Sequence, residues 1–227
     1  MSIWTRIAEA VAALAKGEGL TAVFDRLRAP PQRTVAFTIA IIALGAKMAK
    51  ADGMVTRDEV SAFRQVFAIP VSEEANAARV FNLARQDVAG FDTYARKIAA
   101  MFGDDRETLI DILEGLFHIA AADGQYHAKE DEFLHDVAVI FGLRDCCFRG
   151  LRERYAPDQP HDPYDVLDVD HDADLDSIRA AWKRAVRESH PDRMQARGVP
   201  PEAVKLAERR LIAVNAAWDE ISRQRAA

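Results

Sequence analysis

A short segment occurs twice in this chain, and the repeat constrains the fold more than any other feature. Residues 48–59 read MAKADGMVTRDE, and residues 119–130, which follow 71 positions later, read IAAADGQYHAKE. Each copy has the pattern of an apolar helix end, an Asp-Gly turn in which glycine can take a positive φ, and the capped start of a second helix. The repeat predicts two helix-turn-helix units that face each other in one bundle.

The composition agrees with an all-α fold. The 227 residues are 49% hydrophobic and 29% charged, a balance that excludes a disordered or fibrous chain. Alternating apolar and polar runs rich in β-branched residues, which are typical of strands, do not occur in the sequence. The longest apolar run, 35–46, is too short to span a bilayer, so we expect a buried core helix there.

The charge is unevenly distributed along the chain. A net charge of −6 argues against a general binder of nucleic acids or anionic membranes. Residues 162–176 contain several acidic residues and neither Lys nor Arg, whereas 175–189 contain a cluster of cations. The two cysteines, Cys146 and Cys147, are adjacent, which suits neither a disulfide framework nor a four-ligand zinc site and predicts a reducing compartment.

Prolines and glycines divide the chain into parts. We expect an N-terminal amphipathic helix and linker at 1–30, a helical bundle at 31–155, a Pro-rich linker at 156–161 and a C-terminal domain at 162–227. The N-terminus does not read as a secretory signal. Its helix has two interpretations, a peripheral anchor on a membrane or partner, or a lid packed on the bundle.

The C-terminal domain reads as a helical hairpin. A short helix begins at Pro163 behind its cap Asp162, and a second helix covers about 175–189. This helix stops before Pro191, whose ring disfavours helical conformation in the preceding residue. A long final helix is expected to begin near Pro200 and Pro201.

The bundle resembles the TerB-like domain of tellurite-resistance proteins, in which the Ala-Asp-Gly turn followed by a Glu occurs in both halves. The resemblance covers about 31–155 and implies a divalent metal held by acidic turn residues, here Asp52, Glu59, Asp123 and Glu130. Turn chemistry and the helix dipole explain the same residues without a metal, and two carboxylates per repeat fall short of the oxygen ligands that a hard cation needs. Beyond this metal, no cofactor is expected.

The C-terminal domain resembles the J domain of DnaJ-type co-chaperones. Four elements carry the resemblance in order: Pro-Tyr-x-Val-Leu, Ile-x-x-Ala-Trp-Lys-Arg, His-Pro-Asp and Val-Asn-x-Ala-Trp-x-x-Ile. The resemblance implies that the turn and the basic helix dock on a DnaK-type chaperone and stimulate its ATP hydrolysis. The implied docking residues are His190, Pro191 and Asp192 in the turn and Arg179, Lys183, Arg184 and Arg187 on the helix.

Elementary chemistry is consistent with these roles. Clustered cations steer a chain onto an acidic partner, Asp192 suits a charge-assisted bond with an arginine, and Pro191 keeps the turn rigid. Structural roles remain open as well: His190 as a cation at a helix C-terminus and Asp192 as a helix N-cap. Asp168 stands where the J-domain family usually has glycine, and Trp182 where tyrosine is common.

A TerB-like domain followed by a J domain is similar to the DjlA type of co-chaperone. The sequence predicts a co-chaperone that is not itself an enzyme, with the bundle as a targeting or interaction module for an unknown protein partner. The alternative is a metal-binding stress-response protein that acts through the bundle. The DjlA type has an N-terminal transmembrane helix that this sequence lacks, so the expected location is cytoplasmic, with membrane association unexpected.

Overall fold

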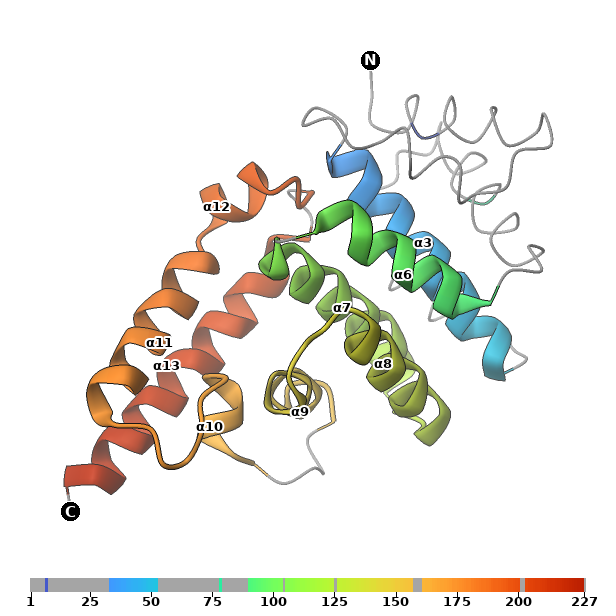
Figure 1. Cartoon of the computed structure of the whole chain (residues 1–227). Helices are drawn as coiled ribbons and strands as arrows, with labels where there is room; N and C mark the ends of the chain where they lie inside the picture. Colours follow the sequence, from blue (N-terminus) through green and yellow to red (C-terminus); the bar gives the residue numbers. More distant parts are fainter. Residues whose placement is uncertain are drawn as a thin grey trace.

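The computed structural model describes residues 7, 33–52, 78, 90–103, 105–124, 126–156, 161–200 and 203–226. All regular elements in these ranges are helical (Figure 1), which confirms the all-α prediction. The expected N-terminal helix, the Asp-Gly turn of the first repeat and most of the Pro-rich linker lie outside the described residues.

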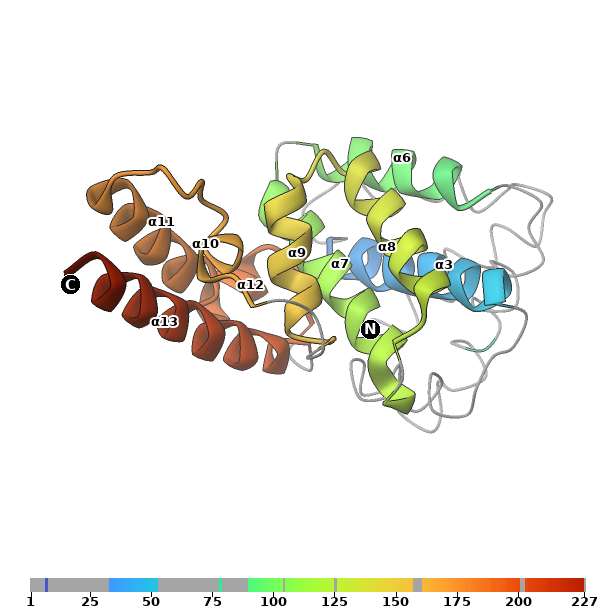
Figure 2. The same ribbon diagram turned by 90° about the horizontal axis from the view of Figure 1, so that it is seen from below.

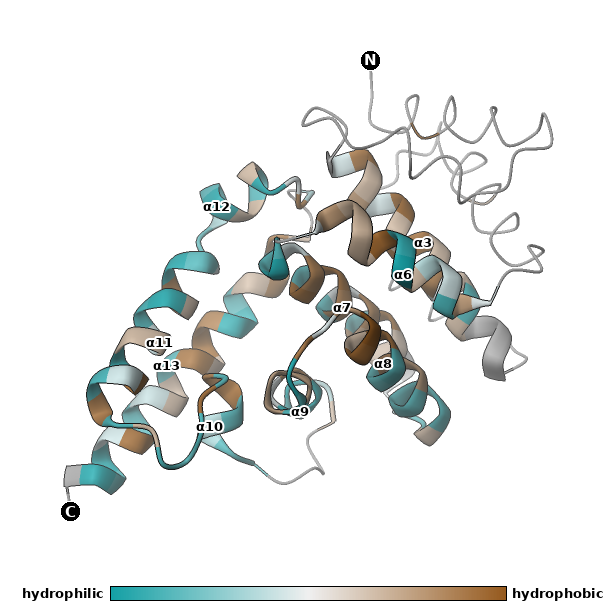
Figure 3. Ribbon diagram, in the orientation of Figure 1, coloured by the Kyte–Doolittle hydropathy of each residue, from teal (hydrophilic) through white to brown (hydrophobic). Residues whose placement is uncertain are grey.

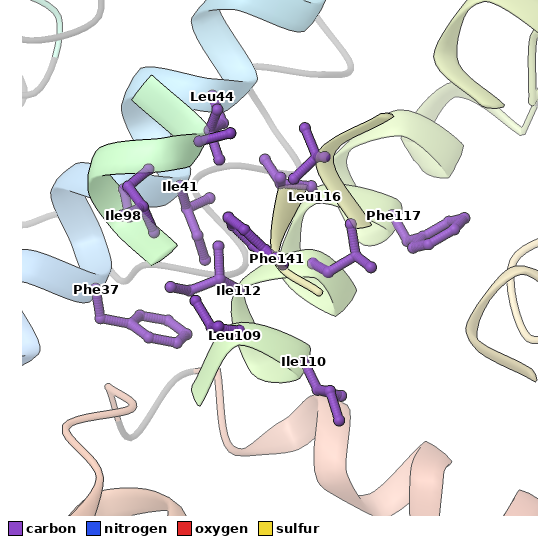
Figure 4. Packing of buried hydrophobic residues seen from close by; sticks show 14 of the residues in the cluster. Phe37, Ile41, Leu44, Ile98, Leu109, Ile110, Ile112, Leu116, Phe117 and Phe141 are labelled. Carbon is purple, nitrogen blue, oxygen red and sulfur yellow. The ribbon is translucent and has the colours of Figure 1, made fainter. Parts of the chain in front are cut away.

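The bundle is built around one buried helix. Helix α3 (Arg33–Asp52) packs against α6 (Phe91–Phe102), α7 (Arg106–Ala120) and α8 (Ala128–Ile140). The apolar run 35–46 is buried along its whole length, as predicted. Figure 4 shows the side chains of Phe37, Ile41 and Leu44 facing Ile112 and Leu116 of α7. This burial of apolar surface is the main stabilising contribution to the bundle.

The second copy of the repeat has the expected local structure. Helix α7 continues into a 3₁₀ turn, η3 (Ala121–Asp123), and Gly124 then takes a left-handed conformation with φ of 80°. His127, the counterpart of Thr56, is the N-cap of α8. Its amide donates to the Glu130 carboxylate at 2.9 Å, so Glu130 caps the helix from within its first turn.

The C-terminal part is a helical hairpin with two short helices. The short helix α10 (Pro163–Val166) follows Asp162, whose carboxylate accepts the Tyr164 amide at 3.0 Å. Helices α11 (Leu175–Glu188) and α13 (Lys205–Ala226) lie side by side (Figures 1 and 2). A small core joins α10, α11 and α13 and contains Tyr164, Leu167, Ile178, Val214, Ala217 and Ile221.

The start of the last helix differs from the sequence prediction. A separate short helix, α12 (Pro191–Ala196), comes directly after α11, and α13 begins at Lys205 instead of near Pro200. Pro191 occupies the first position of α12, where a missing amide and a fixed φ are favourable. Gly198, with φ of 93°, then ends the turn, and the Val199 amide bonds back to the Met194 carbonyl.

Helix α9 (Asp145–Glu153) connects the two parts of the chain. It packs against both α7 and α10 and lies between them in Figure 2. Gly150 permits the contact with α10, because a Cβ atom at this position would lie 2.4 Å from the Asp165 carbonyl oxygen. Beside this glycine, the Arg149 guanidinium donates to both carboxylate oxygens of Asp165, with Nη2 and Oδ1 2.6 Å apart.

Replacing Gly150 with alanine should therefore destabilise the packing of α9 on α10. The obstructing atom belongs to the backbone, so we expect a loss of about 1–3 kcal/mol in the free energy of unfolding, measured by denaturant titration. Gly45→Ala is the matched control, because its Cβ would meet only side-chain atoms at 3.9 Å and beyond. An equal stability of the two variants would contradict this account of Gly150.

His161, the last residue of the predicted linker, contacts two helices. His161 bonds through Nδ1 to the Glu153 carboxylate of α9 and through Nε2 to Glu220 Oε2 of α13, at 2.9 Å for the second pair. These two hydrogen bonds raise the pKa of His161 above its ordinary 6.5, against a smaller opposing effect of burial. When it is protonated, the ring donates to both carboxylates and links α9 to α13.

The two contacts of His161, with Glu153 and Glu220, predict a specific pH dependence of stability. A raised folded-state pKa means that the contribution of His161 is complete below pH 6.5 and is lost as the pH rises through the folded value. His161→Gln should lower Tm more at about pH 6 than at about pH 9. Thermal unfolding followed by circular dichroism measures both differences. A larger effect of the substitution at the alkaline pH would show that the protonated ring does not stabilise the fold.

Candidate functional site

The His-Pro-Asp turn joins α11 to α12. Helix α11 ends at Glu188, Ser189 is its C-cap, and His190 is the N-cap of α12. The ring Nδ1 of His190 accepts the Asp192 amide at 3.2 Å. The expected capping role therefore belongs to His190, and Asp192 lies within the first turn of α12. The three residues form one corner, in which the proline ring fixes the φ of Pro191.

Both polar side chains of this corner face solvent. The His190 side chain is 60% exposed and that of Asp192 is 89% exposed. Ser189, directly before them, is buried. A partner can reach the His190 ring and the Asp192 carboxylate without any rearrangement of the helices.

Three of the four predicted cations form a stripe that leads to the turn. Arg179, Lys183 and Arg187 follow one another at intervals of one helical turn on α11, and all three are exposed. Arg179 lies over the Trp218 ring, 5.6 Å from its centroid, and Arg187 contacts Glu188 at 3.4 Å. Lys183 pairs with no side chain in the part of the chain that the structure describes. In Figure 3 most of the ribbon of α11 has the colour of hydrophilic residues.

Arg184 lies apart from the stripe formed by Arg179, Lys183 and Arg187. It lines a cavity between the hairpin and the bundle, together with Ile110 of α7 and Leu151 of α9. Arg184 is also exposed, but it lies on the side of α11 that faces the bundle, so three of the four predicted cations share the stripe.

Arg179, the first residue of the stripe, packs on a pair of stacked tryptophans. Trp182 of α11 and Trp218 of α13 stack with ring centroids 5.1 Å apart, and Trp182 Nε1 donates to Asn215 Oδ1 at 2.9 Å. Trp182 therefore fills the place of the usual tyrosine with a stacked ring and a satisfied polar atom. The pair packs α11 against α13, which runs antiparallel to it (Figure 1).

Asp168, at the position where glycine is usual, has the left-handed backbone conformation that glycine would supply. Its φ is 54°, and among the described residues it is the one non-glycine with a positive φ. Its carboxylate accepts Arg106 Nη2 of α7 at 2.6 Å and the Cys146 thiol of α9 at 3.0 Å. Arg144 donates to its main-chain oxygen at 3.3 Å. The side chain that replaces glycine connects the hairpin to the bundle.

The cysteines are structural rather than reactive. Cys146 and Cys147 are both free and buried. Burial, followed by the bond to Asp168, raises the pKa of Cys146 to about 11, and burial raises that of Cys147 to about 12. Both groups are therefore thiols at neutral pH, which removes the nucleophilic form.

A buried ionic network lies behind the turn, and the sequence did not predict it. Asp111 and Glu114 of α7 are nearly inaccessible to solvent, and they face arginines from three other segments. Arg154 contacts Glu114 at 2.7 Å, Arg197 contacts Asp111 at 2.8 Å, and Arg210 of α13 contacts both carboxylates. Two carboxylates on a helix of the bundle thus bind two arginines of the hairpin.

Paired charges stabilise the ionised forms of Glu114 and Arg210. Burial opposes the charge on Glu114, but the Arg154 and Arg210 guanidinium groups outweigh it and hold the pKa of the carboxyl below its usual value. Burial also opposes the charge on Arg210, and Glu114 and Asp111 outweigh it and raise the pKa of that group. The sequence signal was present, because these two carboxylates interrupt the apolar run of α7 three residues apart.

The predicted metal ligands are only partly described. The side chains of Asp52, Glu59 and Asp123 lie outside the described residues, and Glu130 acts as the cap of α8. Among the side chains that are described, no group of three His, Cys, Asp or Glu residues has a metal-binding arrangement. A metal in the bundle stays a prediction, and no described contact favours the metal-binding alternative for the whole protein.

Comparison with known proteins identifies both parts of the chain. The family model of the tellurite resistance protein TerB matches residues 38–153, and that of the DnaJ domain matches residues 162–226. The co-chaperone protein DjlA of Photobacterium profundum is 26% identical in an alignment 220 residues long that covers 86% of this chain and 79% of the relative. DjlA of Aliivibrio fischeri is also 26% identical, with 86% and 80% covered. No solved structure matches the chain.

These relatives correct the expected location. The sequence predicted a cytoplasmic protein, and that prediction is wrong, because the curated relatives, including DjlA of Vibrio vulnificus at 23% identity over 90% of this chain, belong to a membrane-anchored type of co-chaperone. Within the described ranges, no helix is long and apolar enough to cross a membrane.

The match to TerB covers half of the chain, and the DnaJ match covers the hairpin with its exposed His-Pro-Asp turn. The similarity to the DjlA relatives extends over both parts. The chain therefore belongs to the TerB family and carries a C-terminal DnaJ domain, in an arrangement similar to that of the DjlA co-chaperones.

Proposed function

We propose that this protein recruits a DnaK-type chaperone and stimulates its ATP hydrolysis, while the bundle serves as a targeting or interaction module. The observation that carries the proposal is the exposed corner of His190 and Asp192 at the end of a solvent-facing basic stripe. The similarity to DjlA co-chaperones and the DnaJ match support a role beside DnaK. ATP is hydrolysed by the chaperone, so this chain supplies contacts and no reacting group.

The stripe is suited to a transient encounter. Its cations lie on one helix. Among the described residues Lys183 has no side-chain partner, so binding to an acidic surface breaks no described contact of this residue. Complementary charge raises the association rate and fixes orientation more than it raises affinity. The stripe would therefore orient the chaperone so that its contact surface meets the His-Pro-Asp turn.

The turn is suited to a specific contact at the end of that encounter. The Asp192 carboxylate lies 3.8 Å from His190 Nδ1 and accepts no side-chain hydrogen bond in the described part of the chain, so it is available to a cationic group of the partner. A guanidinium would bind it through charge-assisted bonds. Pro191 and the His190 cap hold the corner in place, which limits the entropy lost on binding.

Substitutions in the turn test the proposal. His190→Gln and Asp192→Asn should each abolish most of the acceleration of single-turnover ATP hydrolysis by a DnaK-type chaperone, because they remove the contacts at the corner. A loss on the order of tenfold or more corresponds to about 1.4 kcal/mol or more of transition-state stabilisation. His135→Gln, at a half-buried histidine of the bundle, is the matched control and should retain the acceleration. Full activity of both turn variants would refute the proposal.

Substitutions in the stripe test the electrostatic step. The triple variant with Arg179, Lys183 and Arg187 changed to alanine should slow association with the chaperone by roughly tenfold or more and make it less sensitive to salt. Stopped-flow or biosensor measurements at two ionic strengths give both quantities. Lys205→Ala, an exposed cation at the start of α13, should leave both unchanged. An association rate that is independent of salt in the unmodified protein would contradict steering by these cations.

A further inference from the structure

One arginine links the bundle to the His-Pro-Asp turn. Arg197, which follows α12, donates from Nε and Nη2 to Asp111 Oδ2 of α7 at 3.2 and 2.8 Å. The same guanidinium donates to Glu188 Oε2 at 3.2 Å and to the Glu188 main-chain oxygen at 3.1 Å. It therefore bridges a carboxylate of the bundle and the last residue of α11.

Both sides of the turn are tied to Glu188. This residue lies two positions before His190, and its carboxylate also accepts Arg193 Nη1 of α12 at 3.1 Å. The end of α11 and the body of α12 are thus joined by Arg193 and Arg197 across the corner that contains His190 and Asp192. The contact with Asp111 fixes this assembly to α7.

Burial makes the arrangement difficult to change. The Asp111 side chain is 1% exposed and that of Arg197 is 10% exposed. A buried charge without its partner is strongly unfavourable, so neither group can leave the other at small cost. Arg210 Nη2 bonds the second oxygen of Asp111 at 2.7 Å, which holds the carboxylate in one orientation. Rigid placement of this kind differs from an exposed ion pair, which contributes little.

We propose, on the basis of the proposed function, that Asp111 of the TerB bundle is a positioning residue for the His-Pro-Asp turn and acts through Arg197. The bundle then forms part of the structure that presents the turn to the chaperone. Asp111 touches no partner itself. Its effect is to keep the segment 188–197 in the conformation that binds, so that less of the binding free energy is used to order it.

Hydrogen exchange of the full chain tests the positioning directly. In Asp111→Asn, the amides of segment 188–199 should exchange on the order of tenfold faster than in the unmodified protein, because local opening becomes easier. Asp131→Asn is the matched control, since Asp131 of α8 bonds to Tyr126 and Arg152 of the bundle. It should leave segment 188–199 unchanged. Equal protection of this segment in Asp111→Asn and the unmodified chain would overturn the proposal.

ATPase titrations test the consequence for function. The concentration of Asp111→Asn that gives half-maximal stimulation of the chaperone should rise by roughly three- to tenfold, with the plateau rate retained, because a smaller fraction of the turn is ready to bind. Asp131→Asn should titrate like the unmodified protein. An unchanged midpoint for Asp111→Asn would overturn the proposal. An unmodified chain that gives no stimulation would refute the proposed function, and hydrogen exchange would still decide whether Asp111 positions the turn.

A second variant covers the case in which Asp111→Asn fails to fold. Arg197→Lys keeps the positive charge beside Asp111 but cannot bridge Asp111 and Glu188 with a planar fork. It should produce the same faster exchange in segment 188–199. The double variant should show little further increase in exchange, because both substitutions break the same connection, the one between Arg197 and Asp111. Independent, additive effects of the two substitutions would overturn the proposal.

Discussion

The structure depends on the pairing of two buried carboxylates with three arginines. Asp111 and Glu114 lie buried on α7 beside arginines of the hairpin, where an unpaired charge would be severely unfavourable. Their partners come from α9, from the end of α12 and from α13. Satisfying these charges requires the bundle and the hairpin to meet in one arrangement, so the network determines the relative orientation of the two parts.

The second connection between the parts involves a departure from the family pattern. Asp168 accepts the conformational strain of a positive φ, which is of the order of 1 kcal/mol for a residue other than glycine. In return, its carboxylate binds Arg106 and Cys146, and its main chain binds Arg144. A glycine here would relieve the strain and lose the carboxylate contacts. Gly150 completes the same interface by allowing the backbone of α10 to approach α9.

Local signals in the sequence predicted the start of α8, the short helix α10, the end of α11 and the turn. Asp162 with Pro163 marked α10, Pro191 marked the end of α11, and the Asp-Gly turn with Glu130 marked the start of α8. Helix α12 was missed because Pro191 serves both to end one helix and to begin the next. The ionic network was missed for a different reason: Arg210 and Glu114 are 96 positions apart, and only tertiary structure brings them together.

The contacts of His161 and those of Asp168 lie at the two ends of α10. The chain therefore makes contacts on both sides of the helix at which the bundle ends and the hairpin begins. These contacts hold the J domain against α7 and α9. A chaperone bound at the His-Pro-Asp turn would then lie at a defined distance and angle from a partner bound to the bundle. The contacts around α10 would thus set the spacing between the two bound proteins.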